Sequence, residues 1–183
     1  MDGETLENVK SELKDLLKDC KKLCIMGVGN TMKGDDGFGV YVVEKLAEYY
    51  NKIGYDINPN NEVNIINDNL VLLNCGVVPE NFTDVLKKEK PSHILILDAA
   101  LMGEKPGTLK IVDSEDIAEV GFSTHALPMT IIIKYITHYI NTEILVIGIE
   151  PKNLDFGGSL SNEIKEKASQ FTKVLINIIS NRN

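Results

Sequence analysis

Apolar and polar positions along the chain follow two alternating patterns. Amphipathic spacing, in which apolar residues recur on one helical face between charges, predicts helices at residues 6–20, 36–50, 81–90, 128–140 and 160–179. Short, nearly continuous apolar runs predict buried strands at residues 23–28, 70–73, 94–98, 109–112 and 144–149, with a further short strand near residues 63–66. Residues 51–69 are rich in asparagine and are expected to be mainly loop.

This alternation predicts an α/β fold. Strands that are apolar on both faces need cover on both sides, so we expect a three-layer α/β/α architecture with a mostly parallel, twisted sheet and helices on both faces. The length of 183 residues fits a single α/β domain, residues 1–183, made of an N-terminal helical extension at residues 1–22 and a core at residues 23–183. The first helix is expected to pack on that core, with a partner-binding helix as the alternative.

Composition narrows the classes of partner. The chain has 19 Lys and Arg against 27 Asp and Glu, a formal net charge of −8, which disfavours nucleic acid. Its apolar runs are far shorter than the ~20 residues that span a bilayer, and its charged N-terminus does not resemble a secretory signal. Three cysteines at unrelated spacings argue against a disulfide framework. We therefore expect a cytoplasmic protein with no membrane or nucleic-acid partner.

Candidate chemistry lies where the predicted strands end. Ligands of open α/β sheets bind beyond the carboxyl ends of the strands, an edge that we call the rim. This rule brings four residues to the rim: Asp36, Asp98, Glu150 and His125. An acid after four branched apolar residues, as at Asp98, is costly unless it is paired or faces a polar cleft. Asp35 is expected to cap the following helix. Asp36 then remains available for a functional site.

Among the three histidines, His125 is the one placed for a site. His93 begins a strand and so lies at the opposite rim, and His138 is expected on a solvated helical face. Two carboxylates and one imidazole suit a divalent metal such as Ni²⁺ or Zn²⁺, and they equally suit an acid/base pair without metal. Spacing alone does not separate these two possibilities.

Other classes of site have weaker support. Gly27-Val28-Gly29 follows a strand as in a dinucleotide fingerprint, but Met32 occupies the third glycine position and the expected downstream acid is absent. A Cys75–His125 nucleophile pair is conceivable, although a buried, inert thiol is the commoner role for such a cysteine.

Three segments together resemble one family: residues 27–37 (GVGNTMKGDDG), 95–100 (LILDAA) and 123–129 (STHALPM). They are similar to the hydrogenase maturation endopeptidases, the processing proteases of [NiFe]-hydrogenase large subunits. Residues 101–107 and 111–117 are similar to the branch that matures formate-linked hydrogenases. The resemblance extends from about residue 23 to the closing helix.

The resemblance implies an aspartyl-type endopeptidase that removes the C-terminal extension of the large-subunit precursor after nickel insertion. It implies metal ligation by Asp36, Asp98 and His125, with Ni²⁺ presented by the substrate, although other divalent metals could occupy the site. Asp36 and Asp98 are the expected catalytic residues, with Asp98 as the base, and backbone N–H groups of residues 34–37 are candidate oxyanion donors. A nickel-sensing chaperone that does not cut and a metal-dependent peptidase with other substrates are the alternatives.

The chain also departs from the family pattern. About 22 residues precede the first strand, and residues 51–69 resemble an insertion. Asn74-Cys75-Gly76 stands where relatives often have Asp-Gly-Gly, which would place a soft thiolate near the nickel.

Overall fold

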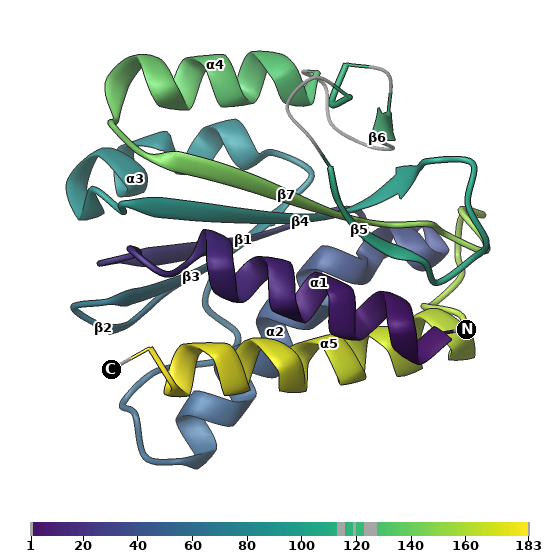
Figure 1. The fold of residues 1–183 in the computed structure, drawn as a ribbon, viewed down its shortest axis with the longest axis horizontal. Helices are drawn as coiled ribbons and strands as arrows, with labels where there is room; N and C mark the ends of the chain where they lie inside the picture. The colour runs from purple at the N-terminus through teal and green to yellow at the C-terminus, as the bar shows by residue number, and fades with distance from the viewer. Residues whose placement is uncertain (1, 113–115, 119, 123–127, 183) are drawn as a thin grey trace.

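The computed structural model describes residues 2–112, 116–118, 120–122 and 128–182, and the side chains from residue 6 onward (Figure 1). In this described part of the chain, seven strands form one sheet in the order β2-β3-β1-β4-β7-β5, with β6 paired to β4. The strands are β1 (Leu23–Val28), β2 (Val63–Asn67), β3 (Leu70–Gly76), β4 (His93–Leu101), β5 (Leu109–Val112), β6 (Gly121–Phe122) and β7 (Glu143–Ile149).

The centre of the sheet is parallel and its margins are antiparallel. The pairs β1–β3, β1–β4 and β4–β7 run parallel, whereas β2, β5 and β6 each run antiparallel to their neighbour. The prediction of a mostly parallel sheet is confirmed. The short strand β6 was not expected, and β4 continues for three residues beyond Asp98, so Asp98 lies within the strand rather than at its last position.

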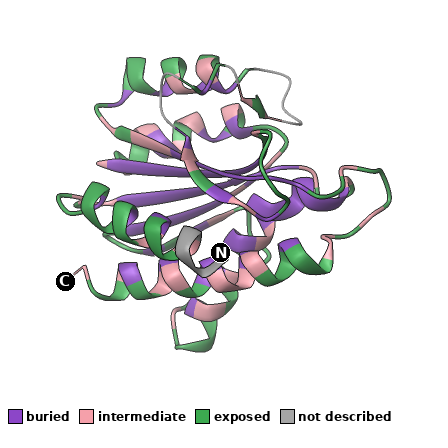
Figure 2. Ribbon diagram, turned by 45° about the vertical axis from the view of Figure 1, so that its right-hand side comes forward, coloured by how far each residue is buried: buried purple, intermediate pink, exposed green. Residues whose placement is uncertain are grey.

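Helices cover both faces, as predicted (Figure 1). The helices are α1 (Asp2–Leu16), α2 (Phe38–Lys52), α3 (Thr83–Glu89), α4 (Met129–Tyr139) and α5 (Asn162–Ser180), with short 3-10 helices η1 (Gly34–Gly37) and η2 (Pro79–Phe82). One buried cluster joins α1, α2 and α5 to one face of the sheet, and another joins α3 and α4 to the other face. Figure 2 shows the burial concentrated on the strands between these layers.

The N-terminal helix packs on the core through an apolar stripe. Val9, Leu13 and Leu17 are buried in the same cluster as α2 and α5, while the charged residues between them face outward. This confirms the expectation of a packed first helix. No helix of the described residues has the length and apolar character needed to cross a bilayer.

Candidate active site

The start of α2 lies against the carboxyl ends of two neighbouring strands. A Cβ at Gly39 would lie 2.0 Å from the carbonyl oxygen of Leu97 and 2.5 Å from that of Val28, so only glycine fits this crossing. Gly29, at φ +136°, is equally constrained, because a Cβ there would lie 1.8 Å from the carbonyl oxygen of Asp36. These contacts hold η1, which carries Asp36, at the ends of β1 and β4.

Asp36 is fully buried and organises the loop that leads to η1. Its Oδ2 accepts a hydrogen bond from the backbone N–H of Asn30 at 2.8 Å, and Asn30 Oδ1 accepts one from the N–H of Met32 at 2.9 Å. A buried carboxylate is stable only when it is bonded or paired in this way.

Asp98 is also fully buried, and it faces the opposite helical layer from its neighbours in the strand. Its Oδ1 accepts a hydrogen bond from the N–H of Ala99 at 2.8 Å. Leu97 and Ala99 belong to the cluster under α2 and α5, whereas Ile96 belongs to the cluster under α3 and α4. Because side chains alternate along a strand, Asp98 points toward the α3 and α4 layer.

The structure thus places η1, which carries Asp36, in contact with β4, in which Asp98 lies level with the carboxyl end of β1. His125 lies outside the described residues, so its place in the predicted triad stays a prediction. Met129, which begins α4, packs in the cluster that Asp98 faces. Within the described residues, no three His, Cys, Asp or Glu side chains are grouped closely enough to hold a metal ion.

Asp35 has a different task from the one predicted. Neither η1 nor α2, both within the described residues, receives a side-chain cap, so the expectation that Asp35 caps the next helix is wrong. Its fully buried carboxylate instead accepts hydrogen bonds from the backbone of a distant loop. The donors are the N–H groups of Lys152 (2.9 Å), Asn153 (2.8 Å) and Ser161 (2.7 Å), together with Ser161 Oγ (3.1 Å).

Glu150, the remaining acid of the predicted rim, follows β7 and is also used structurally. Its Oε2 accepts hydrogen bonds from the N–H groups of Met102 at 2.7 Å and Glu104 at 3.1 Å. Glu150 therefore shapes the loop that follows β4.

Cys75 has the burial expected of the commoner, inert role for a cysteine. It is buried in the cluster under α3 and α4, and its Sγ donates to the carbonyl of Leu73 at 3.8 Å. Burial raises the pKa of the Cys75 thiol well above its usual value, with the neighbouring Cys24 adding to the effect. This burial favours the inert role over a Cys75–His125 nucleophile. His125 lies outside the described residues, so that pair and a soft thiolate near the nickel stay predictions.

The predicted oxyanion donors of residues 34–37 are largely occupied. The N–H groups that already donate to backbone carbonyls are those of Gly34 (to Gly158, 3.2 Å), Asp35 (to Asn153, 2.8 Å) and Asp36 (to Lys33, 3.1 Å). For these three N–H groups the oxyanion prediction is wrong, because their hydrogen bonds fix the loop instead.

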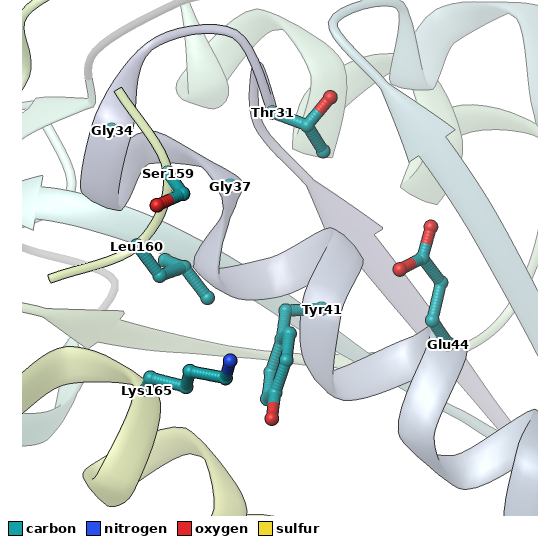
Figure 3. A pocket seen from close by; sticks show the side chains of 8 residues that line it. All are labelled: Thr31, Gly34, Gly37, Tyr41, Glu44, Ser159, Leu160 and Lys165. Atoms are coloured by element: carbon teal, nitrogen blue, oxygen red, sulfur yellow. The ribbon is translucent and has the colours of Figure 1, made fainter. Parts of the chain in front are cut away.

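A pocket of about 210 Å³ lies on the α2 side of η1 (Figure 3). It is lined by Thr31, Gly34, Gly37, Tyr41, Glu44, Ser159, Leu160 and Lys165. In Figure 3 the Tyr41 ring lies between Lys165 and Glu44. Partial burial and the nearby Glu48 raise the pKa of the Glu44 carboxyl. Sequence reasoning missed this pocket, because its walls come from segments more than 100 residues apart.

Comparisons with known proteins agree with this architecture. The family model HycI, described as hydrogenase maturation protease, matches residues 40–178. The MJ0631 protein of Methanocaldococcus jannaschii, which carries the name of the same protease family, is 47% identical over 171 residues, covering 93% of this chain and 96% of its own. Hydrogenase 3 maturation protease of Escherichia coli K12 is 32% identical over 143 residues, covering 78% of this chain and 81% of its own.

The solved structures give the same result. The crystal structure of the [NiFe] hydrogenase maturation protease HycI from Thermococcus kodakarensis KOD1 superposes with a TM-score of 0.78 and is 29% identical, covering 93% of this chain and 99% of that one. The chain therefore belongs to the hydrogenase maturation protease family. Proteins of this family cleave the C-terminal extension from the hydrogenase large subunit, which is the function predicted from the sequence motifs.

Proposed function

We propose that this protease recognises its substrate through the nickel ion that the large-subunit precursor carries, with Asp36, Asp98 and His125 as the protein ligands. The observation that supports the proposal is that Asp36 and Asp98 are both fully buried and belong to elements that contact each other, η1 and β4. Buried carboxylates are costly unless they are hydrogen-bonded or paired, and such groups cluster at functional sites.

The chemistry of the ligands supports nickel. Two carboxylates and one imidazole form a mixed oxygen and nitrogen set that suits a borderline divalent ion and leaves coordination positions open. In this proposal the ion belongs to the substrate, so its capture fixes the scissile peptide bond against the rim. Positioning of this kind supplies a large part of the rate of a bimolecular reaction.

Asp98 is the proposed general base. Asp36 holds the loop through the Asn30 N–H, and Asp98 Oδ1 accepts from the Ala99 N–H within β4. In hydrolysis, a water molecule attacks the scissile carbonyl carbon and Asp98 takes its proton. The C–N bond then breaks as the leaving amine gains a proton, which yields two peptide chains.

The test is processing of a nickel-loaded large-subunit precursor by purified variants. Asp36→Asn, Asp98→Asn and His125→Ala should each lower the rate of processing by about 10²-fold or more, because each removes a ligand or the base. The matched control is Asp56→Asn, which changes an exposed acid of the α2–β2 loop in the same way and should process normally. Nickel-free precursor should remain uncut by the wild-type protein.

Mass spectrometry of the product separates the alternatives. Full processing by Asp98→Asn or His125→Ala would reject the site assignment. An intact precursor held in a stable complex would indicate a chaperone that does not cut. Cleavage of short peptides with added metal, without a nickel-bearing protein, would indicate a peptidase of broader specificity.

A further inference from the structure

Two loops at the carboxyl end of the sheet, residues 30–34 and 152–161, are joined into one layer, which we call the loop shelf. Their backbones are connected by the hydrogen bonds Gly157 N–H to Met32 (2.8 Å), Gly34 N–H to Gly158 (3.2 Å) and Asp35 N–H to Asn153 (2.8 Å). The buried Asp35 carboxylate binds the second loop from beneath, at both of its ends. These hydrogen bonds tie the loop shelf to the core.

The loop shelf presents two apolar side chains to solvent. Phe156 is 72% exposed and Met32 is 64% exposed, which makes them the two most exposed large apolar residues of the described chain. Aromatic and methionine side chains are enriched where proteins bind one another, because they bury much apolar surface on contact. The hydrogen bonds of the loop backbone hold these side chains in their exposed positions.

A continuous chain of hydrogen bonds connects the loop shelf with Asp36. Asp36 Oδ2 accepts from Asn30 N–H at 2.8 Å, Asn30 Oδ1 accepts from Met32 N–H at 2.9 Å, and the Met32 carbonyl accepts from Gly157 at 2.8 Å. Phe156 directly precedes Gly157. A protein that contacts Met32 and Phe156 is therefore seated beside the proposed catalytic end of the sheet.

We propose that Met32 and Phe156 form an exosite that binds an apolar segment of the hydrogenase large-subunit precursor close to its cleavage point. The family acts on a protein substrate, and in the proposed function this substrate is cut beside Asp36, to which the loop shelf is hydrogen-bonded through Asn30. The pocket of Figure 3 shares Thr31, Ser159 and Leu160 with the loop shelf, so it offers an adjoining recess for a substrate side chain. This inference rests on the proposed site at Asp36 and Asp98.

The experiment measures KM and kcat separately for the processing of nickel-loaded precursor, so that an effect on substrate binding is distinguished from an effect on the chemical step. The double variant M32S/F156S should raise KM about tenfold or more and leave kcat within about twofold, because both side chains contact substrate away from the reacting atoms. The conservative variant M32L/F156L should restore KM. The matched control I53S/I65S removes two other exposed apolar residues, 52% and 45% exposed, away from the loop shelf, and should keep the wild-type KM.

The outcomes are distinguishable from failure of the proposed function. A wild-type KM for M32S/F156S, or a fall in kcat without a rise in KM, overturns the exosite. Inactivity of Asp98→Asn combined with a wild-type KM for M32S/F156S rejects the exosite and leaves the proposed site standing. Circular dichroism and the Tm of each variant confirm that the changes act on binding, since all four side chains lie on the surface.

Discussion

At the scale of single residues, Asp35 and Asp36 divide two tasks between adjacent positions. The Asp36 carboxylate accepts from Asn30 in the loop after β1, while the Asp35 carboxylate binds the loop ahead of α5. The strand-end rule selects Asp36 and Asp98 as site candidates because it depends only on local order along the chain. The strand-end rule could not predict the role of Asp35, because its partners are distant in sequence. Lys152 is 117 residues further on and Ser161 is 126 residues further on, and both become neighbours of Asp35 only in the folded protein.

Removal of the Asp35 carboxylate should destabilise the whole protein. Asp35→Ala removes a fully buried carboxylate that accepts three charge-assisted hydrogen bonds from backbone N–H groups. We therefore expect the free energy of unfolding to fall by about 3–5 kcal/mol in urea titration. Ser161→Ala removes only the hydroxyl bond to the same carboxylate and should cost about 1 kcal/mol. A loss below about 1 kcal/mol for Asp35→Ala would show that the loop is held by other contacts.

At the scale of elements, the periodicity of apolar residues predicted the helices and the central strands, because the local sequence reflects whether one face or both faces of an element are buried. The local sequence does not determine the direction of a strand. Hydrophobic pattern reports burial and leaves open whether an edge strand such as β5 runs with or against β7. The two-residue strand β6 was also missed, since it exists only through its pairing with Ala100 and Leu101 of β4.

The packing of α1 gives a matched pair of substitutions one turn apart. Leu13 is fully buried in the core cluster, whereas Leu16 is 36% exposed. Leu13→Ala should lower the free energy of unfolding by about 2–5 kcal/mol, because it leaves a cavity between α1, β5 and α5. Leu16→Ala should cost less than about 1 kcal/mol. Equal losses in chemical denaturation would contradict the observed orientation of the helix.

At the scale of the whole molecule, the reactivity of the cysteine thiols depends on whether the protein is folded. Cys24 and Cys75 are buried in the sheet, and Cys20 is partly buried before β1. Burial raises the pKa of all three thiols, so the reactive thiolate is suppressed at neutral pH in the folded state and recovers when the chain unfolds.

We therefore expect alkylation at pH 8 to modify Cys20 slowly and to leave Cys24 and Cys75 unmodified in the native protein. In concentrated urea all three should react, because solvation returns each pKa to its ordinary value. Intact-mass spectrometry counts the adducts. Rapid modification of native Cys75 would mean that its side chain opens toward the candidate active site.

The course of α5 has a practical consequence for handling the protein. The helix starts next to Ser161, under the loop shelf, and runs to the other end of the sheet, where the guanidinium of Arg182 donates to the Cys20 carbonyl at 2.7 Å (Figure 1). An affinity tag or surface tether joined after this helix leaves the rim of Asp36 and Asp98 open to a bulky client. Attachment ahead of α1, which begins near the rim, would crowd that approach.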